Sequence, residues 1–425
     1  MTKNNTLRAF ALVTSLFFIW GFALNMNPIL IPHLKKACQL TDLQSSYVDS
    51  ASYLAYFLLA IPAGQFMRKY GYKGGILLGL LLVASGAFLL YPASGVRNYA
   101  FILAALFVLF SGSAFLETAA NPYITVLGEP ERAAQRINFS QSFNGLAAFL
   151  APLAGGIFIL SGKNLTPSQK QAMSPDQLNA YLNKESSAVQ LPYVIIGLVV
   201  LTVAFLLYKT HLPEIESETE GEIAEEDRSL ISRIVELVKQ RQLRTGAVAE
   251  FFYVGAQAGI MSFFIRFSER VGGMEEKTAA YLLSISLAGF MVGRFIGTAL
   301  MRTISAVKLL AAYCVVNIGL LLLSFSLDGK LSVYALMCVA FFMSIMFPTI
   351  FSLGIRNLGS KTKLGSSLLI MGIVGGAVIP PIMAKISDLS NIRYAYLVPI
   401  VSFAYILYFA YINLKVKKVE LVSAH

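Results

Sequence analysis

Twelve runs of mostly apolar residues constrain this 425-residue chain more than any other feature of its sequence. A helix needs about 20 such residues to cross the hydrocarbon core of a membrane, and each run is long enough to do so. The sequence therefore predicts an all-α membrane protein with twelve transmembrane helices. The runs fall at about residues 8–33, 44–67, 74–94, 99–127, 137–161, 191–210, 244–266, 278–301, 306–327, 331–355, 364–386 and 393–414.

The composition agrees with a membrane protein and excludes several soluble classes. Hydrophobic residues make up 56% of the chain and charged residues only 13%, which leaves too little polar surface to cover a soluble globule of this size. A nuclease, a kinase or a soluble dehydrogenase is therefore excluded. The cysteines Cys38, Cys314 and Cys338 are isolated, so neither a disulfide framework nor a zinc site is expected.

A polar stretch divides the runs into six and six. The division predicts an N-terminal six-helix bundle over residues 1–210, a linker over 211–243 and a C-terminal six-helix bundle over 244–425. The two halves also resemble each other, for example at residues 121–128 and 347–354. A six-helix unit used twice is typical of carriers in which two similar bundles rock about a site between them.

The linker changes character along its length. Eight acidic residues lie between Glu214 and Asp227, which is typical of a solvated segment. After them, apolar residues recur at helical spacing from Leu230 to Val238. This pattern predicts an amphipathic helix on the membrane surface.

The net charge of +11 is read as a topology signal, because Lys and Arg accumulate on the cytoplasmic side of membrane spans. If the amino terminus is cytoplasmic, most of the 34 lysines and arginines fall on that side. The sequence therefore predicts a multi-pass protein with both termini in the cytoplasm. The lipid bilayer accounts for the charge, and no nucleic-acid partner is expected.

Few polar side chains interrupt the spans. A charge near the bilayer centre costs about 2.5–3.5 kcal/mol on insertion scales and normally faces a cavity or a partner, so these residues are functional candidates. The ionisable residues within the apolar runs are Asp49, Glu117, Glu250 and Arg294. The strongest neutral candidates are Asn25, Asn27, Asn121, Gln141, Asn144 and Gln257.

Two pairs of these residues predict one wet cavity. Glu117 and Asn121 are four residues apart on the fourth span, and Gln141 and Asn144 are three apart on the fifth, so each pair shares a helix face. Amide and carboxylate groups suit a polyol, because each holds hydroxyl groups by paired hydrogen bonds. Sugar binding is therefore expected here, while a dry contact that glues helices together is the alternative.

Three further residues are candidates for the same sugar site. Asn25 and Gln257 offer amide groups within spans. Trp20, the single tryptophan, lies in the middle of a span, where it offers a flat surface to the apolar face of a sugar ring. Core packing is the equal alternative for Trp20.

Four strings carry a resemblance to a known family. They are Phe17-Phe18-Ile19-Trp20, Leu116-Glu117-Thr118-Ala119-Ala120-Asn121-Pro122, Tyr253-Val254-Gly255-Ala256-Gln257 and Pro348-Thr349-Ile350-Phe351-Ser352-Leu353-Gly354-Ile355. With them the chain resembles the fucose/proton symporter branch of the major facilitator superfamily, from the first span to the twelfth. The general loop motif of the superfamily is degraded, because Arg68 occupies its acidic position.

The resemblance implies a fold, an activity and a location. It implies two six-helix bundles and cation-coupled uptake of a monosaccharide, by a monomer in a bacterial inner membrane. Glu117, Gln141 and Asn144 fall on family positions associated with sugar binding and coupling.

The first span departs from the family pattern, which reads Asn-x-Asn-Asp. This chain reads Asn25-Met26-Asn27-Pro28, so the protonatable Asp is absent and proton coupling is in doubt. Asp49 lies roughly 7 Å into the neighbouring second span, at a depth close to that of Asn27.

These residues favour a sodium site. Pro28 lacks an N–H and so frees the carbonyl of Leu24, which together with Asp49 and Asn27 would form an all-oxygen site at a broken helix. Proton coupling through Glu117 or Asp49 and uncoupled transport remain alternatives. In the plainest alternative Pro28 only kinks the helix and Asp49 is wet.

Glu250 and Arg294 lie at similar depths on the seventh and eighth spans. Opposite charges at one depth ordinarily pair, so we expect them to brace the inner gate.

The leading hypothesis is a symporter that imports a neutral hexose of the glucose or galactose type, with sodium as co-substrate and no cofactor. The alternatives are a proton-coupled fucose or hexose symporter and a membrane sugar sensor that signals through the acidic linker. An enzyme is not expected, because His33, His211 and His425 form no cluster and nucleotide-binding loops are missing. The sensor is disfavoured because the sequence holds no soluble domain to carry a signal.

Overall fold

The computed structural model describes residues 3–40, 42–159, 169, 172–210, 212 and 229–422, and every regular element in these residues is a helix. The first half contains α1 (Lys3–Leu24), α2 (Asn27–Ala37), α3 (Asp42–Gly95), α4 (Tyr99–Val126), the short η1 (Pro130–Arg132), α5 (Ala133–Phe158), α7 (Pro175–Ser187) and α8 (Gln190–Lys209). The second half contains α10 (Leu230–Lys239), α11 (Arg241–Arg270), α12 (Glu276–Leu300), α13 (Ala306–Ser326), α14 (Lys330–Met343), α15 (Met346–Gly354), η2 (Gly359–Lys361), α16 (Thr362–Met371), η3 (Gly372–Val374), α17 (Gly375–Leu389), α18 (Ile392–Ala395) and α19 (Leu397–Val422).

The helices account for the twelve predicted spans. Among the described residues, ten segments are long and apolar enough to cross a membrane. One of them, Tyr47–Gly95, is two helices joined at Gly71, whose φ of 70° favours glycine because it has no Cβ. The 26-residue α5 supplies the remaining span.

Three spans are broken in the middle. The first span breaks between α1 and α2, where Pro28 lies in the first turn of α2 and its missing N–H is no loss. The amide Nδ2 of Asn25 donates to the carbonyl of Gly21 at 2.7 Å and so closes the end of α1. Comparable breaks separate α14 from α15 and α16 from α17.

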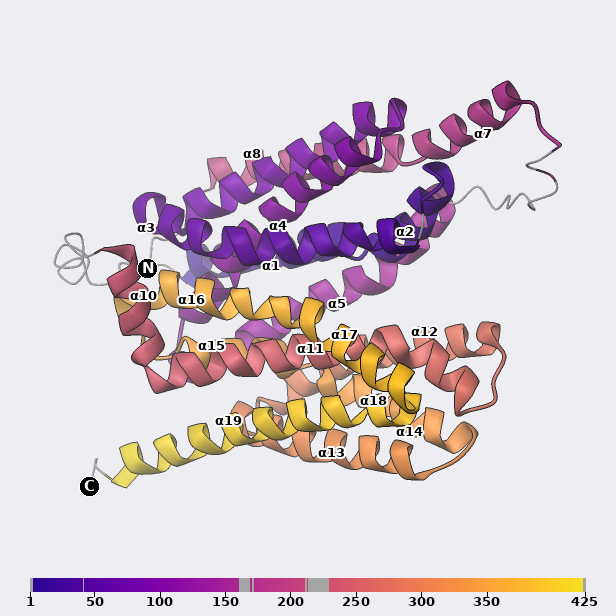
Figure 1. Ribbon diagram of the computed structural model, residues 1–425. Coiled ribbons are helices and arrows are strands. Elements are labelled where there is room, and N and C mark those ends of the chain that lie inside the picture. Colours follow the sequence, from indigo (N-terminus) through magenta and orange to yellow (C-terminus); the bar gives the residue numbers. More distant parts are fainter. Residues whose placement is uncertain are drawn as a thin grey trace.

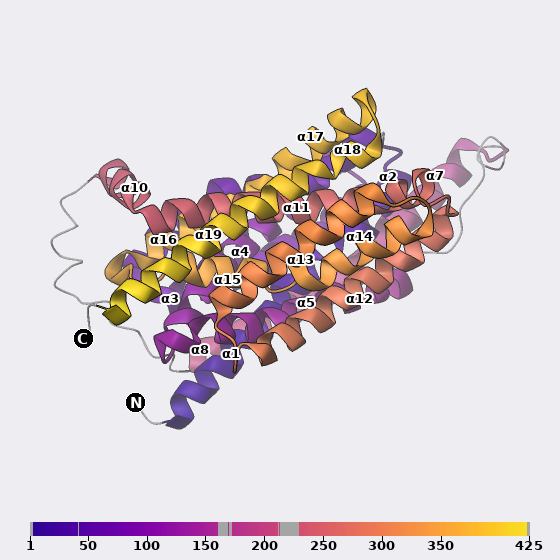
Figure 2. The same ribbon diagram turned by 90° about the horizontal axis from the view of Figure 1, so that it is seen from below.

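The helices gather into two groups that follow the chain order. In Figure 1 the indigo and magenta helices of the first half lie above the orange and yellow helices of the second half, and Figure 2 shows the same molecule from below. Both termini lie at one end of the helices, which we call the terminal face; α7 lies at the opposite end, the distal face. The predicted limits of the bundles, 1–210 and 244–425, remain predictions.

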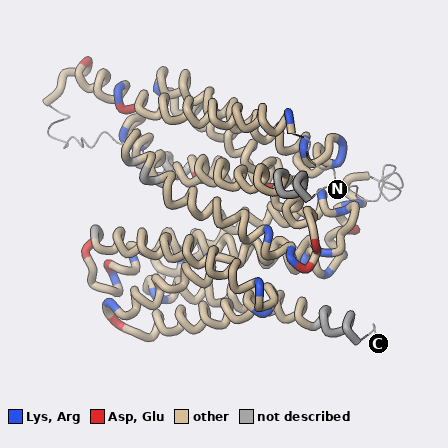
Figure 3. Tube along the Cα trace, turned by 180° about the vertical axis from the view of Figure 1, so that it is seen from behind, with Lys and Arg blue, Asp and Glu red and all other residues tan. Residues whose placement is uncertain are grey.

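Charged residues gather at the two ends of the helices. Figure 3 shows Lys, Arg, Asp and Glu mostly at the terminal and distal faces, while the middle of the bundle is nearly free of them. Such a charge-free belt is what a hydrocarbon layer requires.

The linker is described only in part. The acidic segment from Glu214 to Asp227 lies outside the described residues. The predicted amphipathic helix is present as α10, with Leu237 buried while Ile231 and Val235 are exposed. An exposed apolar row of this kind suits the membrane surface.

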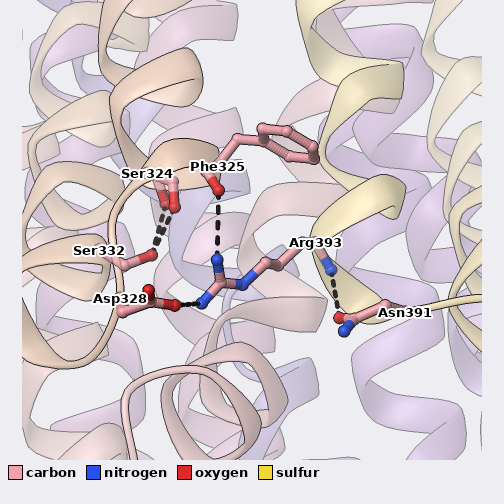
Figure 4. Close-up of polar contacts among 6 residues, drawn as sticks. All are labelled: Ser324, Phe325, Asp328, Ser332, Asn391 and Arg393. Atoms are coloured by element: carbon pink, nitrogen blue, oxygen red, sulfur yellow. Dashed lines mark hydrogen bonds and ion pairs between the residues drawn. The ribbon is translucent and has the colours of Figure 1, made fainter.

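The distal face of the second half is tied by Arg393 (Figure 4). Its guanidinium donates to the carboxylate of Asp328 and, at 3.4 Å, to the carbonyl of Phe325, while its backbone N–H donates to Asn391. Nearby, the hydroxyl oxygens of Ser324 and Ser332 are 3.3 Å apart and share a hydrogen bond. These contacts hold the loop between α13 and α14 against α18.

Candidate functional site

The two halves are joined by polar contacts in the part of the molecule near the terminal face. Asn138 of α5 donates to the hydroxyl of Thr349 on α15 at 3.0 Å, and Ser366 of α16 donates to the carbonyl of Thr118 on α4 at 3.4 Å. Gly64 of α3 permits a further close approach, since a Cβ there would come within 2.1 Å of the Ser367 hydroxyl. The halves are therefore closed against each other on this side.

Arg294 of α12 joins the two halves through hydrogen bonds from its charged side chain. Its Nη1 donates to the backbone carbonyl of Gln141 on α5 at 2.6 Å and lies 3.3 Å from the Gln141 side-chain oxygen. Its Nε donates to the carbonyl of Ser344 at 2.9 Å. That carbonyl is available because its helical partner four residues on is Pro348, which has no N–H. Arg294 is thus held in both halves at once.

The structure brings three of the predicted sugar ligands together. The Gln141 amide donates to the side-chain oxygen of Asn121 on α4 at 3.3 Å. Asn144, one helical turn further along α5, faces α1 so closely that a Cβ at Gly21 would lie 2.6 Å from its amide nitrogen. Amide groups from α4 and α5 therefore converge beside α1.

Glu117 lies at the same level on α4 and is 7% exposed. Its electrostatic neighbours are the hydroxyl of Tyr56, the amide of Asn121 and the guanidinium of Arg294. The Tyr56 hydroxyl and the Asn121 amide nitrogen are buried and have no hydrogen-bond partner in the described structure. The Glu117 carboxyl is thus the group that these two donors face, and the hydroxyl groups of a ligand could share them.

The other predicted sugar ligands, Trp20, Asn25 and Gln257, differ in their burial and contacts. Trp20 is fully buried and packs against Phe17 in a tilted arrangement, with ring centroids 4.3 Å apart, so it belongs to the core. Its indole N–H has no partner among the described residues. Asn25 is engaged at the end of α1. Gln257 of α11 is half-buried in the opposite half.

The structure places Asp49 and Asn27 in contact, in an arrangement that differs from the expected sodium site. The Asn27 amide nitrogen is 3.5 Å from the Asp49 carboxylate, so the asparagine presents a donor where sodium requires oxygen. The Asn27 oxygen is buried without a partner in the described structure, and Asp49 is exposed. Leu24 is half-buried at the end of α1.

The expected pairing of Glu250 with Arg294 is wrong. Glu250 of α11 is fully buried, and neither carboxylate oxygen has a hydrogen-bond partner in the described part of the chain. Arg294 instead donates to the carbonyls of Gln141 and Ser344. The physical reason is that these carbonyls satisfy the guanidinium from both halves, which a carboxylate in its own half does not.

Several residues of this interface were missed by the sequence analysis. Tyr56 lies within an apolar run, and nothing in the sequence around it marks it as a polar contact. Tyr253, whose hydroxyl donates to the carbonyl of Met343 at 3.2 Å, and Thr349 belong to family-like strings that contain no charge. Asn138 lies one turn before the predicted polar face of α5 and extends it toward the terminal face.

A family model described as Major Facilitator Superfamily matches residues 12–374. The chain belongs to the major facilitator superfamily. It is 42% identical over 407 residues to the L-fucose-proton symporter of Escherichia coli (strain K12), covering 94% of this chain and 92% of that protein. It is 40% identical over 405 residues to the glucose/galactose transporter of Brucella abortus biovar 1 (strain 9-941), covering 95% of this chain and 93% of that protein.

A solved structure also matches. The crystal structure of FucP, a major facilitator superfamily transporter in the outward conformation, has a TM-score of 0.89 and 41% identity, and covers 96% of this chain and 99% of that one. The expected resemblance and the fold class are therefore confirmed. The protein is a multi-pass membrane protein of a transporter family and not of an enzyme class.

Proposed function

We propose that this protein is a secondary symporter that imports a neutral monosaccharide together with protons by alternating access. One observation supports the proposal most strongly: a buried carboxyl, Glu117, adjoins the linked amides of Gln141 and Asn121 at the contact between the halves. The same place then offers ligands for sugar hydroxyls and a titratable group for coupling.

The proposed substrate is uncharged. The amides of Asn121, Gln141 and Asn144 both donate and accept hydrogen bonds, as a ring of hydroxyl groups requires. Arg294, the cation beside Glu117, already donates to two carbonyl groups and so has little capacity left to bind an anionic substrate. Glucose, galactose and fucose are the sugars to compare, because matching relatives transport them by name.

Protons replace sodium as the proposed coupling ion. The relative that names an ion names the proton. Asp49 is exposed and receives a donor from Asn27, so the oxygen set on which the sodium hypothesis depends is not assembled around it. Sodium coupling becomes the outcome of the test that would reject this proposal.

We also propose an orientation in the membrane and the extent of the two moving bundles. The terminal face is the cytoplasmic face of a bacterial inner membrane, because it carries the loops rich in Lys and Arg. The closed contact near that face then corresponds to a conformation open to the outside. The moving units are the bundles of residues 1–210 and 244–425, joined by 211–243, within a monomer.

Uptake into proteoliposomes tests the proposal. Labelled glucose, galactose and fucose are offered with an imposed proton gradient in sodium-free buffer, or with a sodium gradient at equal pH. We expect accumulation of at least one sugar under the proton gradient, abolished by an uncoupler. Accumulation under the sodium gradient alone would reject proton coupling, and counterflow of none of the three sugars would reject the substrate class.

A further inference from the structure

Glu250 is a buried acid that the proposed sugar site does not use. It lies on α11 nine residues beyond Arg241, roughly 14 Å from the terminal end of that helix by helical rise. The side chain is fully buried, and neither of its oxygens receives a hydrogen bond from the described residues. An ionised carboxylate in such surroundings is strongly disfavoured, because nothing replaces the water it has lost.

The backbone of the neighbouring span packs closely against α11 at Glu250. Gly372 at the break between α16 and α17 lies against it, and a Cβ at Gly372 would come within 2.9 Å of the Glu250 Cβ and 3.1 Å of the Phe251 nitrogen. The break thus places backbone, without a side chain, against this acid. The acid is therefore enclosed and lies next to the break in the eleventh span.

Glu117 and Glu250 are both buried, but their polar neighbours differ. Glu117 has the Tyr56 hydroxyl, the Asn121 amide and the Arg294 guanidinium as neighbours, all of which favour a negative charge. The charged neighbour of Glu250 is Glu117 itself, which disfavours a second negative charge. Glu250 is the more buried of the two, and neither of its oxygens has a hydrogen-bond partner among the described residues, so it has less than Glu117 to stabilise a negative charge.

Arg294 is a neutralising group already present in the half to which Glu250 belongs. Tyr253, one helical turn after Glu250 on α11, is an electrostatic neighbour of both Arg294 and Glu250. In this structure Arg294 is held by the Gln141 carbonyl in the other half. When the halves separate at the terminal face this bond must break, which releases a cation in the half to which Glu250 belongs.

We propose that Glu250 is the proton-binding group of the second half, protonated in the present conformation and deprotonated when Arg294 leaves Gln141. The O–H bond of the Glu250 carboxyl breaks, the proton passes to water at the terminal face, and Arg294 neutralises the carboxylate that remains. On the return step a proton from water forms the O–H bond again, and Arg294 goes back to Gln141. This inference rests on the proposed function and adds to Glu117 a second titratable group, in the other half of the molecule.

The decisive variant is Glu250→Gln, which keeps the size of the side chain and removes its proton. Glu269→Gln is the matched control, because Glu269 lies on the same helix and is exposed. Each variant is reconstituted, and sugar counterflow at equal pH is measured beside accumulation driven by a proton gradient. For E250Q we expect counterflow to be retained and proton-driven accumulation to be lost, and for E269Q we expect both at the level of the unmodified protein.

Other outcomes are equally informative. If the unmodified protein accumulates sugar with protons and E250Q does so to the same ratio, this inference is overturned and the proposed function stands. If the unmodified protein accumulates sugar with sodium alone, the proposed function fails first. Should E250Q lose counterflow as well, Glu250→Asp decides: we expect accumulation with a shifted pH profile, and an unshifted profile overturns the inference.

Discussion

Arg294 on α12 donates a hydrogen bond of 2.6 Å to the backbone carbonyl of Gln141 on α5, and this bond links the two halves of the molecule. The acceptor belongs to the main chain, so substitution of the Gln141 side chain leaves the bond in place. The side-chain oxygen of Gln141, 3.3 Å from the same guanidinium nitrogen, adds a second and weaker contact. The two functions of this position, joining the halves and binding a ligand, can therefore be separated by mutation.

Arg294→Met should shift the protein toward a conformation that is open at the terminal face. A hydrogen bond from a charged donor contributes about 1.5–3 kcal/mol, which corresponds to a population change of roughly 10- to 150-fold. Spin labels at Glu131 and Thr303, both exposed near the terminal ends of α5 and α12, should report a longer distance. Lys308→Met, which removes an exposed charge, serves as the control. An unchanged distance in the Arg294 variant would show that Arg294 does not hold the two halves together.

Gln141→Ala and Asn144→Ala should weaken sugar binding without opening the terminal face. Each removes a neutral hydrogen bond, about 0.5–1.5 kcal/mol, so we expect the Kd to rise roughly 2- to 13-fold for each single variant. Binding by isothermal calorimetry in detergent gives the affinities, and the same pair of spin labels checks the conformation. Unchanged affinity in both variants would move the sugar site elsewhere.

Glu117→Gln should reduce proton-driven accumulation more than it reduces sugar binding. The amide keeps an acceptor for the Tyr56 hydroxyl beside it but removes the charge that Arg294 and Asn121 favour. Accumulation ratio and counterflow rate are measured in the same vesicles. An equal loss of binding and accumulation would make Glu117 a plain sugar ligand.

The contact between α2 and α7 at the distal face should weaken in acid. His33 is buried, its Nε2 lies 2.8 Å from the carbonyl of Glu185, and burial lowers its pKa despite the nearby Glu185 carboxylate. An undocked histidine, with a pKa of about 6.5, takes up a proton before the docked one does, so the docked state loses stability as the pH falls below that value.

Hydrogen exchange along α7 measures this effect. We expect faster exchange at acidic than at neutral pH after correction for the intrinsic rate, and no such difference in His33→Gln. Slower exchange in acid would mean that the Glu185 carboxylate outweighs burial at His33.

The sequence predicted the helices well because a membrane span is a one-dimensional property: apolar length alone identifies it. The break of the first span was foreseen from Pro28, whose missing N–H acts locally. The meeting of Asn121 with Gln141 was foreseen because each lies on a polar helix face, and two polar faces on consecutive spans favour each other.

The sequence failed where the direction of a side chain decides. Depth along a helix placed Glu250 and Arg294 at one level, but depth does not say which neighbour each one faces. Arg294 crosses to the other half because Pro348 frees the carbonyl of Ser344 and α5 presents the carbonyl of Gln141. Backbone acceptors of this kind leave no mark in the sequence of the half that supplies them.

The most direct test of the central claim, that protons and a neutral sugar move together, is the movement of protons driven by sugar. Coupling is reciprocal, so a sugar gradient must drive protons just as a proton gradient drives sugar. Sugar is added outside sodium-free, weakly buffered proteoliposomes and the external pH is recorded. We predict that the external solution becomes more alkaline when the sugar is added and does not when an uncoupler is present; sugar entry without any pH change would contradict proton symport.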